Sequence, residues 1–303
     1  MSIYKNVIQG LRNIITIKNL IYSSNCEQKR QLLQQAILNK TTPGVTSKKH
    51  IEQDVIISLT SYGNRIYEVA LTIESLMEQT ILPNRIILWL SYNEKNIPQA
   101  LRLLEKRGLE INFCEDIGSY KKLIPTLRNY HDDIIITVDD DVFYDFDLIE
   151  NLIITHKEFP NDILAHRMHR ITLNKDMEVA PYKEWHQCIK DYNPSFLNFA
   201  VGVGGVLYPP NSLDSRVFDE STFMDICKYG DDIWFKCMSI LNNVQTRGVY
   251  SHNKKGEDYL PNMSISEFGL FSDNVIGNNR NDSQIKAVFE KYEIYNILKS
   301  QII

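Results

Sequence analysis

The chain has 303 residues, of which 43% are hydrophobic and 23% charged, an ordinary composition for a globular protein that is long enough to bury a sizeable core. The formal net charge of -5 argues against a nucleic-acid-binding protein, which needs a basic surface, but not against a small nucleotide ligand. The five cysteines are scattered without CxxC spacing, so we expect reduced thiols in a cytoplasmic protein.

Residues 1–50 predict a helical extension that ends in a polar linker. The linker, 41–50, contains Pro43 and Gly44. The helix fits either of two roles, packing on the domain or resting on an anionic membrane surface as an amphipathic helix, here the cytoplasmic face of the inner membrane. No apolar run is long enough to cross a bilayer. The apolar residues at helical spacing are Ile3, Val7, Leu11, Ile14 and Ile15.

From residue 51 onward, predicted strands and helices alternate. Apolar runs rich in β-branched residues predict strands at 55–59, 85–90, 109–113 and 134–138. Helical patterns follow the first three of these runs, which predicts right-handed βαβ units and a mostly parallel sheet in an α/β fold. These helices are expected at 69–77, at 98–108 and around 121–130.

Past residue 160 the alternation fades. We expect strands at 163–167, 201–208 and 246–250, and a helix over 223–241 that is interrupted at Gly230. A loop-rich tail is expected to end in a helix at 283–298. Before this region, Asp145 or Asp147 is expected to cap the helix that begins near Leu148.

Three consecutive aspartates follow the most strand-like run of the chain. Asp139, Asp140 and Asp141 come directly after the 134–138 strand, and open α/β sheets bind ligands beyond the carboxyl ends of their strands. Three like charges at one place need a cation to offset them. Carboxylate oxygens are the protein ligands that Mg²⁺ and Mn²⁺ prefer, so the triplet predicts a metal-diphosphate site. The alternative is that acidic residues after a strand only begin a turn.

The order of apolar strand, acidic triplet, glycine-rich segment and second acidic pair resembles the GT-A glycosyltransferases. It is most similar to the bacterial family-2-like enzymes that build surface polysaccharides such as capsule and lipopolysaccharide. The matching stretches are VIISLTSYGNRI (55–66), KLIPTL (122–127), IIITVDDDV (134–142), VGVGGVLYPP (201–210) and GDDIWFK (230–236).

The resemblance implies a GT-A fold, that is, a Rossmann-like αβα sandwich with a central, mostly parallel sheet. It spans most of 54–240, so residues 1–50 form an extension to a glycosyltransferase domain at 51–303. The implied parts of this domain are a nucleotide-binding half at about 51–145, an acceptor half at about 146–260, and a tail with a final helix at 261–303.

For the metal, the resemblance implies that Asp139 and Asp141 hold Mn²⁺ or Mg²⁺, with Asp139 also reaching the ribose or a metal-bound water. The metal neutralises charge on the departing nucleoside diphosphate. Asp140 is expected to bond the sugar or the loop. His252, after the 246–250 strand, is the implied third metal ligand, although the surrounding SHNKKG is not diagnostic and a surface histidine is the alternative.

For catalysis, the resemblance implies Asp232 as the general base that deprotonates the acceptor hydroxyl, with Asp231 as its neighbour. The alternative is that Gly230 and Asp231 only start a helix, with Asp231 as its cap. The two interpretations are compatible, because a cap at Asp231 would hold Asp232 toward the cleft.

Further residues are expected near the nucleotide. Thr60 and Tyr62 could contact the base, Asp116 could accept a hydrogen bond from a uracil imide, and Arg65 or Lys122 could face the diphosphate. The alternatives are a packed turn for Tyr62 and solvated charges for Arg65 and Lys122. The resemblance implies that Gly202, Gly204 and Gly205 line the donor sugar and acceptor, with a tight packed turn as the alternative. Trp185 and Trp234 are candidate platforms for stacking on sugars, with core packing as the alternative for Trp234.

The sequence therefore predicts a metal-dependent, hexosyltransferase-type glycosyltransferase. It would move a sugar from a nucleotide-sugar donor, a UDP-sugar, to a hydroxyl of an oligosaccharide or lipid-linked glycan with inversion. One alternative is a phosphotransferase of the haloacid-dehalogenase type with Asp139 as nucleophile, although Phe143 stands where that family has a small β-branched residue. The other is a non-catalytic nucleotide-binding protein of glycan assembly.

Overall fold

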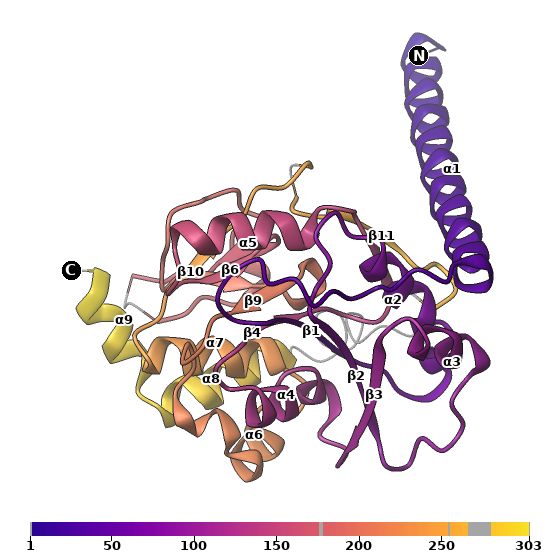
Figure 1. Cartoon of the computed structure of the whole chain (residues 1–303). Coiled ribbons are helices and arrows are strands. Elements are labelled where there is room, and N and C mark those ends of the chain that lie inside the picture. The colour runs from indigo at the N-terminus through magenta and orange to yellow at the C-terminus, as the bar shows by residue number, and fades with distance from the viewer. Residues whose placement is uncertain (1, 176–177, 254, 266–279, 303) are drawn as a thin grey trace.

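The computed structural model of the chain describes residues 2–175, 178–253, 255–265 and 280–302, and it contains one seven-stranded sheet (Figure 1). Its strands are β1 Val55–Thr60, β2 Arg85–Ser91, β3 Leu109–Cys114, β4 Ile134–Thr137, β6 Ile163–Ala165, β9 Val206–Tyr208 and β10 Thr246–Gly248. They lie in the order β10-β6-β9-β4-β1-β2-β3. The four strands β1 to β4 run parallel, as do β6 and β10, and β9 pairs antiparallel with both β4 and β6. The predicted α/β class and mostly parallel sheet are confirmed.

Helices cover both faces of this sheet. One face is covered by α1 Ser2–Asn39, α2 Val69–Met77, α3 Gln99–Glu105 and α5 Leu148–Glu158. The other face is covered by α4 Ile124–Asn129, α6 Glu220–Ile226, α7 Asp231–Leu241, α8 Arg280–Lys291 and α9 Ile294–Ile302. Figure 1 shows α5 on one side of the sheet and α4, α6 and α8 on the other. The architecture is a Rossmann-like αβα sandwich.

The double covering explains why the strands are apolar without alternation. In β4, Ile134 and Ile136 belong to the core under α2 and α5, whereas Ile135 belongs to the core under α7. In β9, Leu207 enters the first core, while Val206 and Tyr208 enter the second. Every position of these strands is therefore buried.

Several predicted elements differ in detail from the observed ones. Residues 201–208 are not one strand, because Gly202–Gly204 forms a 3₁₀ turn and Gly205, at φ +85°, turns the chain into β9. The predicted terminal helix is two helices, α8 and α9, because Glu293 adopts φ +52° between them. Two small antiparallel sheets were not predicted. They pair β5 Val142–Tyr144 with β11 Tyr259–Pro261, and β7 Met168–Arg170 with β8 Asn198–Ala200.

The long helix α1 joins the domain only through its C-terminal part. Leu33 and Ile37 are buried in the core beside α2 and α3, and Arg30 forms an ion pair with Glu68 at 3.0 Å. Residues 13–25 are exposed throughout, so the predicted packed helix holds only for its later turns. Within the described ranges, no helix combines the length and apolar character needed to cross a membrane. All five cysteines are free thiols.

Candidate functional site

The strand order reverses between β1 and β4, which is where an open α/β sheet has its ligand crevice. The chain winds from β1 through β2 to β3 on one side, then returns to place β4 on the other side of β1. The helices α2 and α3 accordingly lie on one face and α4 on the opposite face. Ligands of open α/β sheets bind at such a reversal, beyond the carboxyl ends of the strands. The acidic triplet follows β4 at this point, and the loop containing Ser61 and Arg65 follows β1.

The middle aspartate of the triplet joins these two loops. Asp140 is buried, and its carboxylate accepts hydrogen bonds from Ser61 Oγ at 2.6 Å and Arg65 Nε at 3.1 Å. Arg65 also donates through Nη2 to the other carboxylate oxygen. The hydroxyl of Thr72 in α2 donates to the backbone carbonyl of Asp140 at 3.0 Å. Of the two roles expected for Asp140, the structure therefore shows contact with the loop.

The outer aspartates are more accessible and less fully paired. The side chains of Asp139 and Asp141 are 31% and 25% exposed. Asp139 Oδ1 lies 3.0 Å from Lys122 Nζ, and Asp141 Oδ2 lies 2.9 Å from Arg65 Nη2. Among the described residues, Asp139 Oδ2 and Asp141 Oδ1 make no hydrogen bond or ion pair. Burial and the charge of Asp139 raise the pKa of Asp141 to about 6 against the opposing effect of Arg65, so the negative charge here is incompletely offset.

Lys122 connects the triplet with the second acidic pair. Its buried ammonium lies 3.0 Å from Asp139 Oδ1, 2.8 Å from Asp231 Oδ2 and 3.9 Å from Asp232 Oδ1. Burial alone would lower the pKa of Lys122, but the charges of Asp139, Asp231 and Asp232 raise it well above its ordinary value. The acidic triplet and the Asp231–Asp232 pair are far apart in the sequence, but both lie beside the ammonium group of Lys122.

The second acidic pair begins α7. Gly230 is the N-cap residue and no side chain caps this helix, so the expected cap at Asp231 is wrong. Asp231 Oδ1 instead accepts a hydrogen bond from Ser119 Oγ at 2.8 Å. Asp232 Oδ2 accepts one from the backbone N–H of Gly202 at 2.9 Å. Asp231 and Asp232 are therefore held by loops from two other parts of the chain.

Asp232 has the electrostatic setting of a base that works near neutral pH. Its side chain is 26% exposed. Burial raises the pKa of Asp232 to about 7, with Lys122 opposing the shift and the charges of Asp231 and Asp139 adding to it. A general base is most effective when its pKa lies close to the working pH.

The glycine-rich segment reaches the acidic residues because β9 runs antiparallel to β4. The residues just before β9 therefore lie beside the residues just after β4, as the pairing of Thr137 with Val206 shows. Tyr144 ties the two segments together. Its hydroxyl accepts from the backbone N–H of Asp139 at 2.9 Å and donates to the carbonyl of Val203 at 3.0 Å.

Gly202 is where a side chain would disturb the site most directly. A Cβ atom there would lie 2.8 Å from Lys122 Nζ and 2.9 Å from Asp232 Oδ1. Both atoms end movable side chains, so we expect Gly202→Ala to fold but to displace them. Any reaction that uses these groups should slow by about 10–100-fold, since small misplacements of reacting groups have effects of this size.

The matched variant is Gly205→Ala. Position 205 has φ +85°, and a Cβ atom would lie 2.9 Å from Leu148 in the core. This variant should lose about 1–3 kcal/mol of unfolding free energy. Thermal unfolding and catalytic activity of both variants check the prediction, and Gly202→Ala with unchanged activity would contradict it.

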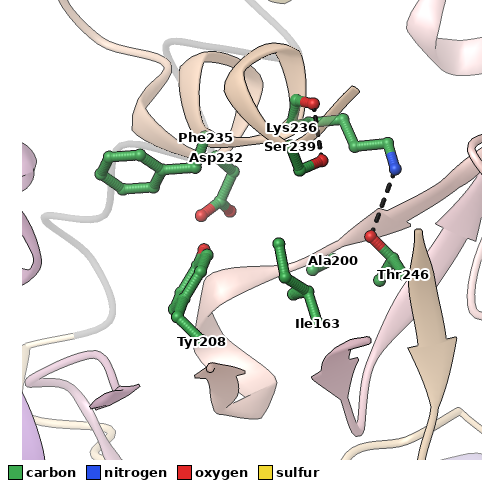
Figure 2. A pocket seen from close by; sticks show the side chains of 8 residues that line it. All are labelled: Ile163, Ala200, Tyr208, Asp232, Phe235, Lys236, Ser239 and Thr246. Carbon is green, nitrogen blue, oxygen red and sulfur yellow. Dashed lines mark hydrogen bonds between the residues drawn. The ribbon is translucent and has the colours of Figure 1, made fainter. Parts of the chain in front are cut away.

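A small cavity lies beside Asp232 (Figure 2). Its volume is about 10 Å³, room for about one water molecule. Figure 2 shows Asp232 and Lys236 on the same helix, with Lys236 Nζ reaching Thr246 Oγ1 at 3.2 Å. Burial, together with the charge of Arg170, lowers the pKa of Lys236 to about 7. The cavity is far too small for a nucleotide. The lining residues are Ile163, Ala200, Tyr208, Asp232, Phe235, Lys236, Ser239 and Thr246.

The side chains predicted to contact the nucleotide differ in their exposure and in whether they are already hydrogen-bonded. The side chain of Asp116 is 59% exposed, and its ion pair with Lys121 lowers the pKa of its carboxyl group. The half-exposed ring of Tyr62 has the guanidinium of Arg65 above it, 5.6 Å from the ring centre. The hydroxyl of Thr60 donates to the carbonyl of Trp89 at 2.8 Å, which engages it within the sheet. Tyr62 and Asp116 can therefore meet a ligand without breaking the fold.

His252 has a different partner from the one expected. Its Nε2 lies 2.6 Å from Asp147 Oδ2, and this contact raises the pKa of His252. Ligand atoms of Asp145, Asp147 and His252 lie within 4.8 Å of one another, whereas in the described ranges Asp139, Asp141 and His252 form no such group. Asp147 is the N-cap residue of α5, as one prediction had it, but its side chain makes no capping bond.

The two tryptophans proposed as sugar platforms are core residues. Trp185 and Trp234 are buried, and their indole N–H groups donate to the carbonyls of Ala180 at 2.8 Å and Val217 at 3.1 Å. A ring without exposed faces cannot stack on a sugar, so that expectation is wrong. The contacts that sequence reasoning missed involve single polar residues without a pattern. They are Ser61, Thr72, Ser119 and Tyr144.

No family model matches the chain, and no curated protein matches it. Among solved structures, it is similar to HddC from Yersinia pseudotuberculosis at 12% identity and a TM-score of 0.38, over 65% of this chain and 92% of that one. It is also similar to the inositol-1-phosphate CTP transferase from T. maritima at 10% identity and a TM-score of 0.36, over 65% of this chain and 84% of that one. At these scores the two likenesses carry no inference about what this chain does.

Proposed function

We propose that the chain is a metal-dependent glycosyltransferase that transfers a sugar from a UDP-sugar to a hydroxyl of a glycan acceptor, with inversion at the anomeric carbon. The observation that carries the proposal is the meeting of Asp139, Asp231 and Asp232 around Lys122 at the β1–β4 crevice. A transferase needs one group that helps to neutralise the leaving diphosphate and, beside it, one that deprotonates the acceptor hydroxyl. The acidic triplet would supply the first, and Asp231–Asp232 the second.

The donor side suits a divalent cation. Asp139 and Asp141 each keep a carboxylate oxygen that no described residue engages, and hard oxygen donors fit Mg²⁺ or Mn²⁺. Bound there, the cation would act as a Lewis acid toward the diphosphate. Lys122 would add its positive charge beside Asp139, and Tyr62 and Asp116 would contact the nucleoside. Arg65 and Asp140 hold the loop in place beneath them.

The acceptor side depends on Asp232. The acceptor hydroxyl would give its proton to a carboxylate oxygen of Asp232 as its own oxygen attacks the anomeric carbon and the bond to the diphosphate breaks. The pKa of about 7 makes Asp232 a usable proton acceptor at neutral pH. Lys122 Nζ lies 3.0 Å from Asp139 Oδ1 and 3.9 Å from Asp232 Oδ1, so its positive charge would be close to both carboxylates as the proton moves. A single displacement of this kind inverts the anomeric configuration.

The donor and the metal are tested together by thermal shift. We expect one UDP-sugar, with Mn²⁺, to raise the melting temperature by about 5 °C at a concentration near a hundred times its dissociation constant. Asp141→Asn should lose the metal-dependent part of this shift because it removes an expected ligand. The measurement is a panel of UDP-, GDP-, CMP- and dTDP-sugars with and without chelator.

Asp147→Asn is the control, because Asp147 belongs to the separate group with Asp145 and His252. It should keep the full metal-dependent shift. A shift that survives chelator in the unaltered protein, or that depends on Asp147 instead of Asp141, would show that the metal is misassigned. NMR of the product linkage then decides between inversion and retention.

A further inference from the structure

The first two-thirds of α1 stand away from the domain (Figure 1). From residue 13 to residue 25 every side chain is exposed, and burial begins only at Cys26. At a rise of 1.5 Å per residue, residues 2–25 extend about 36 Å. From residue 13 to residue 25, no side chain of the helix is therefore buried in the core of the domain.

The exposed turns are strongly apolar. Six large apolar side chains between positions 14 and 22 are each 48% to 64% exposed. At 3.6 residues per turn they spread over more than half of the helix circumference. An exposed apolar surface of this kind indicates a binding partner. The six residues are Ile14, Ile15, Ile17, Leu20, Ile21 and Tyr22.

The charge of this part of the chain is one-sided. Lys5, Arg12 and Lys18 are its charged residues, and the first acidic residue of the chain is Glu27. The remaining residues carry a formal charge of -8, since the whole chain carries -5 and the first 26 residues +3. The partner of the helix should therefore be apolar and anionic.

We propose that α1 binds the surface of an anionic phospholipid bilayer through residues 13–25, with its cations facing the lipid headgroups. The apolar side chains would enter the interface, and no described helix is suited to span the bilayer, so α1 would lie on it. The acidic domain would be repelled by the same surface. The net negative charge of the domain opposes close contact with that surface, so we expect binding to depend on the projecting helix and not on the domain.

A second copy of the chain fits this helix less well. Two such helices would bring only positive charges together, in either orientation, because residues 1–26 contain no carboxylate. A coiled coil also needs a narrow apolar seam, whereas the exposed apolar side chains of this helix spread over more than half of its circumference. The bilayer remains the partner that satisfies both the apolar surface and its charge.

The test is sedimentation of the full chain with vesicles. We expect binding to phosphatidylglycerol mixed with phosphatidylethanolamine to exceed binding to phosphatidylcholine by about tenfold, and to weaken at high salt. Ile17→Asn/Ile21→Asn should lower partitioning by about tenfold or more. The matched control is Leu32→Asn/Leu38→Asn, two leucines that are 56% and 72% exposed on the packed part of the same helix, which should leave partitioning unchanged.

The proposal does not depend on the proposed enzymatic activity, because neither donor nor metal enters the test. Absence of vesicle binding by the unaltered chain would overturn it, as would equal effects of the two double variants. Analytical ultracentrifugation without lipid supplies the remaining outcome. A dimer that Ile17→Asn/Ile21→Asn dissociates would assign the helix to a second copy instead.

Discussion

Replacing Asp232 with asparagine is expected to lower the rate of sugar transfer by about 10²–10⁴-fold, because the acceptor hydroxyl loses its base. Asparagine keeps an oxygen that can accept the hydrogen bond from Gly202, so the loop should stay in place. In the unaltered protein, transfer should rise with pH as Asp232 ionises around its pKa of about 7. Release of the nucleoside diphosphate, followed from pH 5 to 9 with the donor found by thermal shift and a glycan acceptor extract, measures both effects.

The same substitution should not harm folding. The pKa of Asp232 is raised in the folded state, so its ionisation costs stability as the pH rises from about 4 to 7. Asp232→Asn removes that cost, and we expect its melting temperature at pH 8 to be unchanged or a few degrees higher, by about 2–4 °C per kcal/mol. Asp225→Asn, an exposed aspartate on the preceding helix, is the control for transfer. Full transfer activity in Asp232→Asn would refute the mechanism.

Replacing Lys122 with methionine is expected to have the largest effect on stability. The substitution leaves three nearby carboxylates without their shared cation, and removing one partner of a buried ion pair costs about 3–5 kcal/mol. Because the carboxylates of Asp139 and Asp232 are partly exposed, we expect about 2–4 kcal/mol of unfolding free energy to be lost at pH 8. Urea unfolding measures the loss, and transfer should fall with it.

The pH dependence identifies the cause of that loss. Since the pKa of Lys122 is raised in the folded state, its stabilising effect is present throughout the neutral range. Without it the pKa of Asp232 should rise further, so the variant recovers stability as the pH falls from 8 to 5. Lys286→Met is the control, because the ion pair between Lys286 and Glu290 is exposed on both sides and should matter little. Equal stability of Lys122→Met and the unaltered protein would mean that the cluster is not electrostatically coupled.

The sequence predicts the part of the fold from β1 to β4 well because its signals are local. The runs that became β1 to β4 are apolar throughout, as strands covered on both faces must be, and the helices between them have clear apolar stripes. The position of the acidic triplet after β4 follows directly from that pattern. The carboxylates that meet Lys122 were likewise among the predicted residues.

What the sequence could not supply are the contacts between distant segments. Nothing at Ser119 indicates that its hydroxyl binds Asp231, and nothing at Tyr144 indicates that it links Asp139 to Val203. The antiparallel direction of β9 is equally hidden, because a short apolar run is the same in both directions. The contact between His252 and Asp147 is another example, because it depends on how the loop after β10 packs against the start of α5.

The burial of Asp140 against Arg65 has an evolutionary consequence. The guanidinium of Arg65 is the buried counter-charge of the middle carboxylate, so a lineage that lost Arg65 would leave Asp140 as an unpaired ion under the loop. Positions 65 and 140 should therefore change together among homologous chains. Positions 139 and 141 should instead vary with the ligand that each homologous chain binds. The central aspartate of a D-x-D motif in this lineage would be retained because of Arg65, which lies 75 positions earlier in the chain.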